Sequence, residues 1–285
     1  MGRGTAELVD LLVLLGMGAV IPLGLALIDE PALARLRRLW PLAAVPGALS
    51  LWLPRGGPLA IGSAALYALG TLALAAHAPL RLARTRSLAP PEVAVLTALA
   101  APSVAGLALV AERSGYRLLG FDLDILALTV PHFHYAGFTA ALVAGLVCRA
   151  VPDRPAARWA ALSVPAGTLL VLGAYFVGDR AELAGAAVLT AGMWLVGLLT
   201  WRELRVRGGG GGGRSTPVLL GVSAAVLAVT MLLALWWALG EASGLPHPTL
   251  GWMAATHGVG NALGFALCSL LAWRRLAPAT REYTP

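Results

Sequence analysis

Residues 217–239 read PVLLGVSAAVLAVTMLLALWWAL, an apolar run without a single charged side chain. A helix needs about 20 apolar residues to cross the hydrocarbon core of a bilayer, so this run is long enough to span it. The same pattern recurs before and after it, at 8–28, 39–54, 58–78, 92–111, 123–148, 159–178, 183–201 and 249–273. The sequence therefore predicts an all-α, polytopic transmembrane helix bundle of about nine spanning helices, folded as a single membrane domain over residues 1–285.

The composition of the 285-residue chain excludes an ordinary soluble enzyme, a disordered protein and a disulfide scaffold. Hydrophobic residues make up 58% of the chain and charged residues 12%, whereas a soluble domain carries roughly 25% charge. Cys148 and Cys268 lie inside apolar runs, which is typical of small core residues and not of a disulfide. The run at 39–54 is the weakest of the nine, because it is short and contains Pro41 and Pro46, which favour a kinked or re-entrant segment.

The distribution of basic residues predicts the orientation of the chain in the cell membrane. All 21 basic residues are arginine, and sixteen of them follow the first, third, fifth and seventh runs or lie in the C-terminal tail. By the positive-inside rule the N-terminus is outside and the C-terminus is cytoplasmic. Arginines placed between apolar runs act as topology signals and attract anionic membrane lipid, so no nucleic-acid partner is expected.

Six consecutive glycines at 208–213 interrupt the charged segment between the seventh and eighth runs. Neither a GK[ST] nor a GxGxxG context accompanies them, so the segment does not have the pattern of a phosphate-binding loop. A glycine run of this kind is typical of a flexible linker, which the topology places in the cytoplasm.

Three histidines lie within the predicted spans. His132 and His134 belong to LALTVPHFHYAGF at 126–138, and His257 belongs to GWMAATHGVGNALGF at 251–265. His132 and His257 both lie about 12 Å along the helix from the predicted outer end. Ionisable groups at this depth tend to face the protein interior and mark function. We therefore expect His132 and His257 to face each other, with Asn261 on the same helix face as His257.

The spacing of His132 and His134 limits what the pair can do together. Residues two apart on a regular helix point about 200° apart, so only one of them can face a shared site. We expect His132 to be that residue and His134 or Tyr135 to face a second neighbour, unless Pro131 breaks the helix. The alternative is that these side chains only join helices by hydrogen bonds. Close helix packing is expected at Gly137, Gly258, Gly260 and Gly264.

These residues suggest a membrane-embedded enzyme that uses histidine acid–base chemistry on a lipophilic small molecule, as an isomerase, cyclase or dehydratase does. Histidine suits this role because its pKa lies near ambient pH. Carboxylates near the outer helix ends are candidates for an entrance to the site. The expected catalytic residues are His132, His134, Tyr135 and His257, and the expected substrate-binding residues are Asp10, Asp122, Asp124 and Asn261.

The two motifs PHFHYAGF at 131–138 and HGVGNALGF at 257–265 together resemble the YndJ-like family of bacterial integral membrane proteins. The resemblance implies a multi-helix bundle with motif histidines at His132, His134 and His257, and it does not imply a reaction. Members are sometimes labelled transporters, so a transporter or proton-coupled carrier that uses the same site is the first alternative.

The tetrapeptide HFHY at 132–135 also resembles a stretch of haem–copper oxidase subunit I. No cofactor is expected, because that family needs several further ligand histidines, and the second, fourth, sixth, seventh and eighth predicted helices contain no histidine. A haem between His132 and His257, or a transition metal held by them and a carboxylate, is the second alternative. The sequence leaves the oligomeric state open.

Overall fold

The computed structural model describes residues 1–206 and 215–281, and within these ranges the chain forms helices and no strand. The predicted all-α membrane fold is confirmed, and the glycine linker predicted at 208–213 lies outside the described residues. The described residues contain eight helices that are long and apolar enough to cross a membrane. They are Arg3–Leu25, Pro58–Thr85, Pro90–Ser114, Leu123–Ala150, Pro155–Ala174, Asp179–Leu204, Ser215–Ser243 and Leu250–Leu276.

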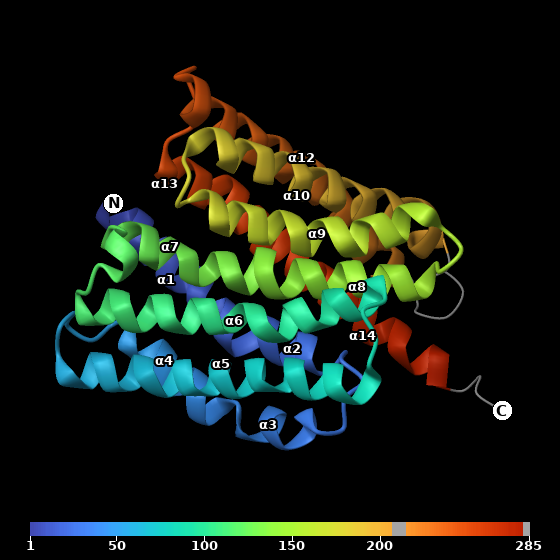
Figure 1. Ribbon diagram of the computed structural model, residues 1–285, viewed down its shortest axis with the longest axis horizontal. Coiled ribbons are helices and arrows are strands. Elements are labelled where there is room, and N and C mark those ends of the chain that lie inside the picture. The colour runs from blue at the N-terminus through green and yellow to red at the C-terminus, as the bar shows by residue number, and fades with distance from the viewer. Residues whose placement is uncertain (207–214, 282–285) are drawn as a thin grey trace. The chain divides into compact units, whose positions relative to one another are not determined.

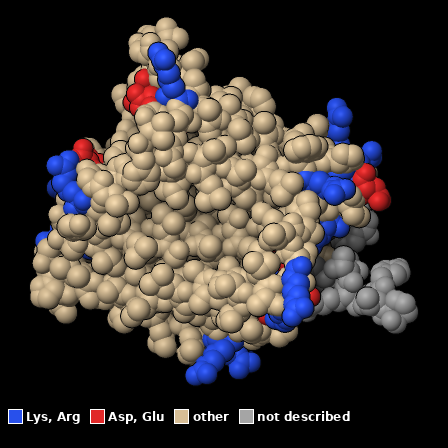
Figure 2. Space-filling view, viewed as in Figure 1, with Lys and Arg blue, Asp and Glu red and all other residues tan. Residues whose placement is uncertain are grey.

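The chain divides into two compact units. Unit 1 comprises Met1–Ser87 and Val95–Thr139, and unit 2 comprises Leu88–Ala94 and Ala140–Pro285. The expectation of a single membrane domain stays a prediction. On the face drawn in Figure 2, uncharged side chains cover almost the whole surface, and arginine and acidic side chains gather in a few clusters. This surface suits a protein that faces hydrocarbon along most of its helices.

Unit 1 holds the first half of the chain. Its elements are α1 (Arg3–Leu15), η1 (Gly16–Val20), α2 (Ile21–Leu25), α3 (Leu33–Leu39), α4 (Pro41–Ser50), α5 (Pro58–Thr85), most of α6 (Pro90–Ser114), η2 (Leu118–Gly120), α7 (Leu123–His132) and η3 (Phe133–Thr139). The segments η1 and η3 are π-helical, so each widens the long helix in which it lies. Figure 1 shows α4 beside α5, against which it packs.

The predicted second span, at 39–54, corresponds to α4 and the last residue of α3. Pro41 has no amide hydrogen, which separates the two helices at Trp40, although Trp40 itself keeps helical backbone angles. The amide of Leu33 bonds to the carbonyl of Glu30 at one end, and the carbonyl of Leu51 accepts a bond from Arg113 at the other.

A charged cluster of unit 1 lies at each end of the α3–α4 pair. The Glu30 cluster contains Glu30, Arg81 and Arg84, and the Glu112 cluster contains Arg55, Glu112 and Arg113. The helix α5 runs from the second cluster to the first, since the amide of Gly56 bonds to the carbonyl of Arg113. The pair α3–α4 joins the same two clusters in the opposite direction, so a 10-residue helix takes part in a full crossing of the unit.

Unit 2 holds α8 (Ala140–Ala150), α9 (Pro155–Ala174), α10 (Asp179–Leu199), η4 (Thr200–Leu204), α12 (Ser215–Ser243), α13 (Leu250–Met253), η5 (Ala254–Gly258), η6 (Gly260–Leu267) and α14 (Cys268–Arg281). Figure 1 shows α9, α10 and α12 side by side, in agreement with their contacts. Small residues permit this packing, because a Cβ at Gly167 would collide with the backbone of Leu189. The segments η5 and η6 are π-helical and carry the second histidine motif.

Candidate functional site

A buried tyrosine–histidine pair lies in the middle of unit 1. Tyr67 Oη on α5 and His134 Nε2 on η3 are 2.6 Å apart, and both residues are 0% exposed. The two rings meet edge to face, with centroids 6.0 Å apart and planes at 87°. Trp40 closes the other side of Tyr67 with a second edge-to-face contact and donates its indole N–H to the carbonyl of Met17.

Glycine makes the space that this pair occupies. A Cβ at Gly16 would overlap Nδ1 of His134, and a Cβ at Gly47 would lie 2.7 Å from the Cβ of Tyr67. Gly16 also begins the π-helical segment η1, so the widened turn of the first span lies directly against the imidazole. The sequence therefore positions His134 through residues on three other elements.

The histidine itself lies on a second widened turn. Pro131 removes one amide hydrogen from α7, and the π-helical segment η3 begins two residues later. The hydroxyl of Thr139 donates to the carbonyl of His134 at 2.9 Å, five residues back along the chain. Single π-helical turns within α-helices are frequent at functional sites.

The second ring nitrogen of His134 has no hydrogen-bond partner in the part of the chain that the structure describes. Three buried side-chain nitrogen or oxygen atoms of the described residues lack a hydrogen-bond partner: His134 Nδ1, Thr190 Oγ1 and Arg205 Nε. If Tyr67 donates to Nε2, Nδ1 carries a proton that no group accepts. If Nε2–H donates to Tyr67, Nδ1 holds a free lone pair. In both cases, Nδ1 is the ring nitrogen that can still exchange a proton or form a hydrogen bond.

The two neighbours of His134 that the sequence also singled out have different surroundings. Tyr135 is buried, and its hydroxyl donates to the carbonyl of Leu12 at 2.7 Å, which ties η3 to α1. His132 is exposed, with its ring 6.1 Å from that of Phe133. His134, and not His132, is the buried histidine of this segment, because its side chain occupies the space beside Gly16.

The second motif forms a closed ring of hydrogen bonds in unit 2. His257 Nδ1 lies 2.8 Å from the carbonyl oxygen of Thr230, which can only accept, so Nδ1 carries the proton. Nε2 then accepts from the amide of Asn261 at 3.1 Å, and Thr230 Oγ1 donates to Asn261 Oδ1 at 2.9 Å. The expected placement of Asn261 beside His257 is confirmed. Every polar atom of this imidazole has a partner, which is the arrangement of a residue that joins helices.

Glycines allow α12 to approach this ring. A Cβ at Gly260 would lie 2.8 Å from the methyl carbon of Thr230, and a Cβ at Gly264 would lie 2.7 Å from the side chain of Val226. His132 belongs to unit 1 and His257 to unit 2. That these two residues face each other stays a prediction.

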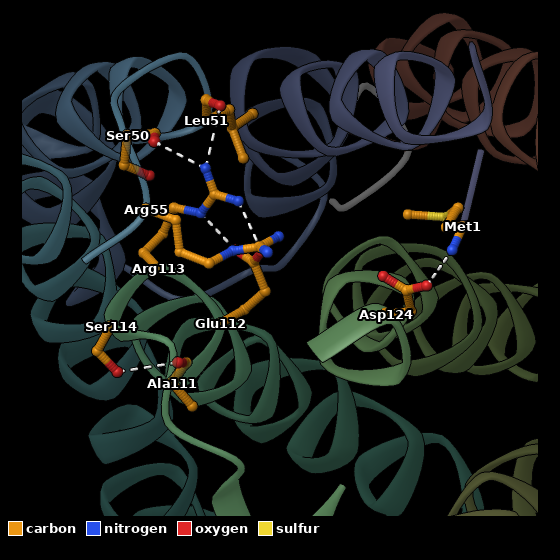
Figure 3. Close-up of polar contacts among 9 residues, drawn as sticks. All are labelled: Met1, Ser50, Leu51, Arg55, Ala111, Glu112, Arg113, Ser114 and Asp124. Atoms are coloured by element: carbon orange, nitrogen blue, oxygen red, sulfur yellow. Dashed lines mark hydrogen bonds and ion pairs between the residues drawn. The ribbon is translucent and has the colours of Figure 1, made fainter. Parts of the chain in front are cut away.

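The predicted entrance acids lie near the N-terminal end of α1 and α7 in unit 1. Asp124 forms an ion pair with the amino group of Met1 (Figure 3), and Asp122 forms one with Arg117. Asp10 lies half-buried within α1. Their role in binding a substrate stays a prediction.

The Glu112 cluster was not predicted. Arg113 donates to the carbonyls of Ser50 and Leu51 at 3.3 and 3.1 Å and pairs with Glu112, which also pairs with Arg55 (Figure 3). Glu112 is 2% exposed and Arg113 8%. The signal in the sequence is an adjacent Glu-Arg pair at the end of an apolar run, where buried charges must be paired.

The Glu30 cluster at the other end of unit 1 was also missed. Glu30 pairs with Arg81 and Arg84, and the hydrogen bond from Arg84 holds the pKa of the Glu30 carboxyl below its usual range. In the described part of the chain, no three His, Cys, Asp or Glu side chains are arranged to hold a metal ion.

Comparison with known proteins identifies the family of the chain. The family model described as YndJ-like protein matches residues 11–265. The chain belongs to the YndJ-like family. This YndJ-like chain is 25% identical over 237 residues to the uncharacterized membrane protein YndJ of Bacillus subtilis (strain 168), which covers 82% of the chain and 41% of that relative. The chain thus spans about two fifths of the relative's length. No solved structure gives a significant match. The protein is a multi-pass membrane protein.

Proposed function

We propose that the protein performs acid–base chemistry on a lipophilic molecule inside the membrane, with His134 and Tyr67 as the proton-exchanging pair. One observation carries the proposal: Nδ1 of His134 is buried and has no hydrogen-bond partner in the described part of the chain. A buried polar atom without a partner costs about 1–3 kcal/mol. A histidine that served only to pack helices would avoid this cost, as His257 does.

The chemistry needs only the neutral imidazole. With Nε2–H donating to Tyr67, the lone pair of Nδ1 removes a proton from one carbon of the substrate. The Nδ1 proton exchanges with water, and the imidazolium then delivers a proton from Nδ1 to another carbon. The Tyr67 oxygen stabilises the cation by accepting the hydrogen bond from Nε2. The net reaction is an isomerisation, which consumes no oxidant or reductant.

Substrate access requires a local movement, because both side chains are 0% exposed. The segments η1 and η3 are the natural places for it, since their π-helical hydrogen bonds border the imidazole on two sides. The exposed side chain of His132, on the same helix as His134, gives a lipophilic molecule a polar contact at the surface of unit 1.

The test is deuterium incorporation into lipid. Purified protein is reconstituted into liposomes made from a total lipid extract of its bacterial host, incubated in D2O buffer, and the extracted lipids are analysed by mass spectrometry. We expect one lipid species to gain deuterium with the wild type and to remain unlabelled with His134→Gln. Tyr67→Phe should slow the labelling. His77→Gln is the matched control, because it removes a histidine from the same helix as Tyr67 and should label normally.

Three outcomes count against the proposal. Equal labelling by the wild type and His134→Gln would assign His134 to packing. A proton flux across the liposome membrane that requires His134, with no labelled lipid, would replace the enzyme with the proton-coupled carrier. A haem absorption band in the purified protein that is lost in His257→Ala would instead support the redox alternative.

A further inference from the structure

A shallow cleft of about 420 Å³ lies on the surface of unit 2, where the end of η4 meets the first turns of α12. One wall is formed by the last residues before the undescribed segment, and the floor is formed by α12. The residues that carry the argument are Trp201, Arg205, Val218, Gly221, Val222 and Ala225.

Among the described residues that line the cleft, Arg205 supplies the one positive charge. Its guanidinium lies over the ring of Trp201, with the central carbon 4.0 Å from the ring centroid. Its Nε is buried and has no hydrogen-bond partner among the described residues. A guanidinium N–H without an acceptor is costly when buried, so this atom is suited to an acceptor from outside the chain.

The floor of the cleft is an apolar stripe that runs along the membrane-spanning helix α12. Val218, Val222 and Ala225 follow one another at spacings of four and three residues, so they share one face of the helix over about 10 Å. Val218 is 61% exposed and Val222 40%. Gly221 lies between these walls: a Cβ there would make ordinary contacts, 3.4 Å from Arg205 Cδ and 3.6 Å from the ring of Trp201, so a larger side chain would fill the cleft.

We propose that this cleft binds one phospholipid with an anionic headgroup. A headgroup phosphate oxygen accepts the hydrogen bond from Arg205, and one acyl chain lies along the stripe from Val218 to Ala225. The first turn of α12 lines the same end of the cleft through Pro217, and the positive end of a helix dipole favours a negative charge there.

The apolar stripe decides between a lipid and a free anion. Soluble phosphate would use Arg205 alone and gain nothing from three exposed apolar side chains below it. A phospholipid uses both parts of the cleft. The arginine distribution predicts that this end of α12 faces the cytoplasm, and anionic lipids are concentrated in that leaflet.

The test is a lipid titration by native mass spectrometry on the purified full chain, with phosphatidylglycerol and phosphatidylcholine as probes. The wild type should hold one phosphatidylglycerol in preference to phosphatidylcholine. Arg205→Ala should weaken phosphatidylglycerol binding about tenfold or more, as expected for the loss of a hydrogen bond to a charged group. Arg202→Ala is the matched control, because it removes an exposed arginine of η4 that does not line the cleft.

A second pair of variants tests the stripe without changing charge. Gly221→Leu fills the cleft and should abolish the preferential binding, whereas Gly221→Ala makes only ordinary contacts and should retain it. If Arg205→Ala and Arg202→Ala weaken phosphatidylglycerol binding equally, the lipid is held by general electrostatic attraction to arginine and not by this cleft. Displacement of the lipid by millimolar inorganic phosphate, or unchanged binding in Gly221→Leu, would overturn the lipid proposal.

Discussion

Replacement of Glu30 by alanine tests how unit 1 is held together at one end. The Glu30 side chain is 2% exposed and pairs with Arg81, which is 7% exposed, and with Arg84, which is 53% exposed. Removing one partner of a buried ion pair costs about 3–5 kcal/mol, since the other charge stays buried without compensation. Arg84 can turn to solvent, and Arg81 keeps the carbonyl of Asp29 at 3.1 Å as an acceptor. We therefore expect the lower end of the range, about 3 kcal/mol.

The loss can be measured as a change in Tm in detergent. A thiol-reactive fluorescent dye reports unfolding when the buried Cys148 becomes accessible. The unfolding entropy of a chain of this length, about 0.6 kcal/mol per kelvin, converts the expected loss into a fall of about 5 °C. Glu7→Ala is the control, because Glu7 and Arg3 form an ion pair whose side chains are 65% and 94% exposed, and such pairs contribute less than about 1 kcal/mol. A fall of less than 1 °C in Glu30→Ala would refute the reasoning.

The pH dependence of the same cluster has a definite sign. Because the bond from Arg84 lowers the pKa of Glu30 in the folded state, the ionised carboxylate stabilises the fold above the ordinary range of a glutamate. That contribution is lost as the pH falls through the folded-state pKa. The difference in Tm between the wild type and Glu30→Gln should therefore be constant near neutrality and shrink in acid below about pH 4.3, the ordinary glutamate value. A difference that grows in acid would contradict this assignment.

Three further predictions concern packing, the second motif and topology. Gly16→Ala should lower the Tm by roughly 2–5 °C, since overpacking costs about 1–3 kcal/mol, whereas Gly18→Ala, with open space around it, should not; equal Tm values would contradict the packing. Thr230→Val should lower the free energy of unfolding by about 1–3 kcal/mol in the same assay, because it leaves Oδ1 of Asn261 without its hydrogen bond. An unchanged Tm would show that the hydrogen-bond ring of His257, Thr230 and Asn261 does not stabilise the fold. In a cysteine-free background, an impermeant maleimide applied to cells should label Tyr116→Cys and not Asp153→Cys, and the opposite pattern would reverse the predicted orientation.

The fold class could be predicted from the sequence because the signal lies in long apolar runs. The predicted runs coincide with the eight long helices of the described chain, and the ninth, at 39–54, coincides with the short helix α4 and part of α3. The two prolines that made this run the weakest also explain its form, since Pro41 separates α3 from α4. The first helix begins at Arg3 and not at residue 8, so the apolar run alone did not give the end of the helix.

The candidate site was only partly predictable. The motif HFHY marked the right segment, and the rule that residues two apart point in opposite directions correctly separated the two histidines. The choice of His132 as the partner of His257 rested on matching depths along two helices and stays a prediction. The burial of His134 could not be predicted in this way, because it depends on the space beside Gly16. Tyr67 carries no motif of its own, and only the packing of α5 against η3 identifies it as the partner of His134.

Hydrogen-bond accounting separates the two histidines that the sequence treats alike. Hydrocarbon offers no hydrogen bonds, so a polar group within the membrane must find its partners in the protein. His257 does so through Thr230 and Asn261, and the four-residue spacing of histidine and asparagine is explained by this ring without any substrate. His134 has one strong partner, and its other ring nitrogen has none within the ranges 1–206 and 215–281. Loss of activity on replacing His257 therefore has to be judged against the stability of the fold, whereas loss on replacing His134 bears directly on chemistry.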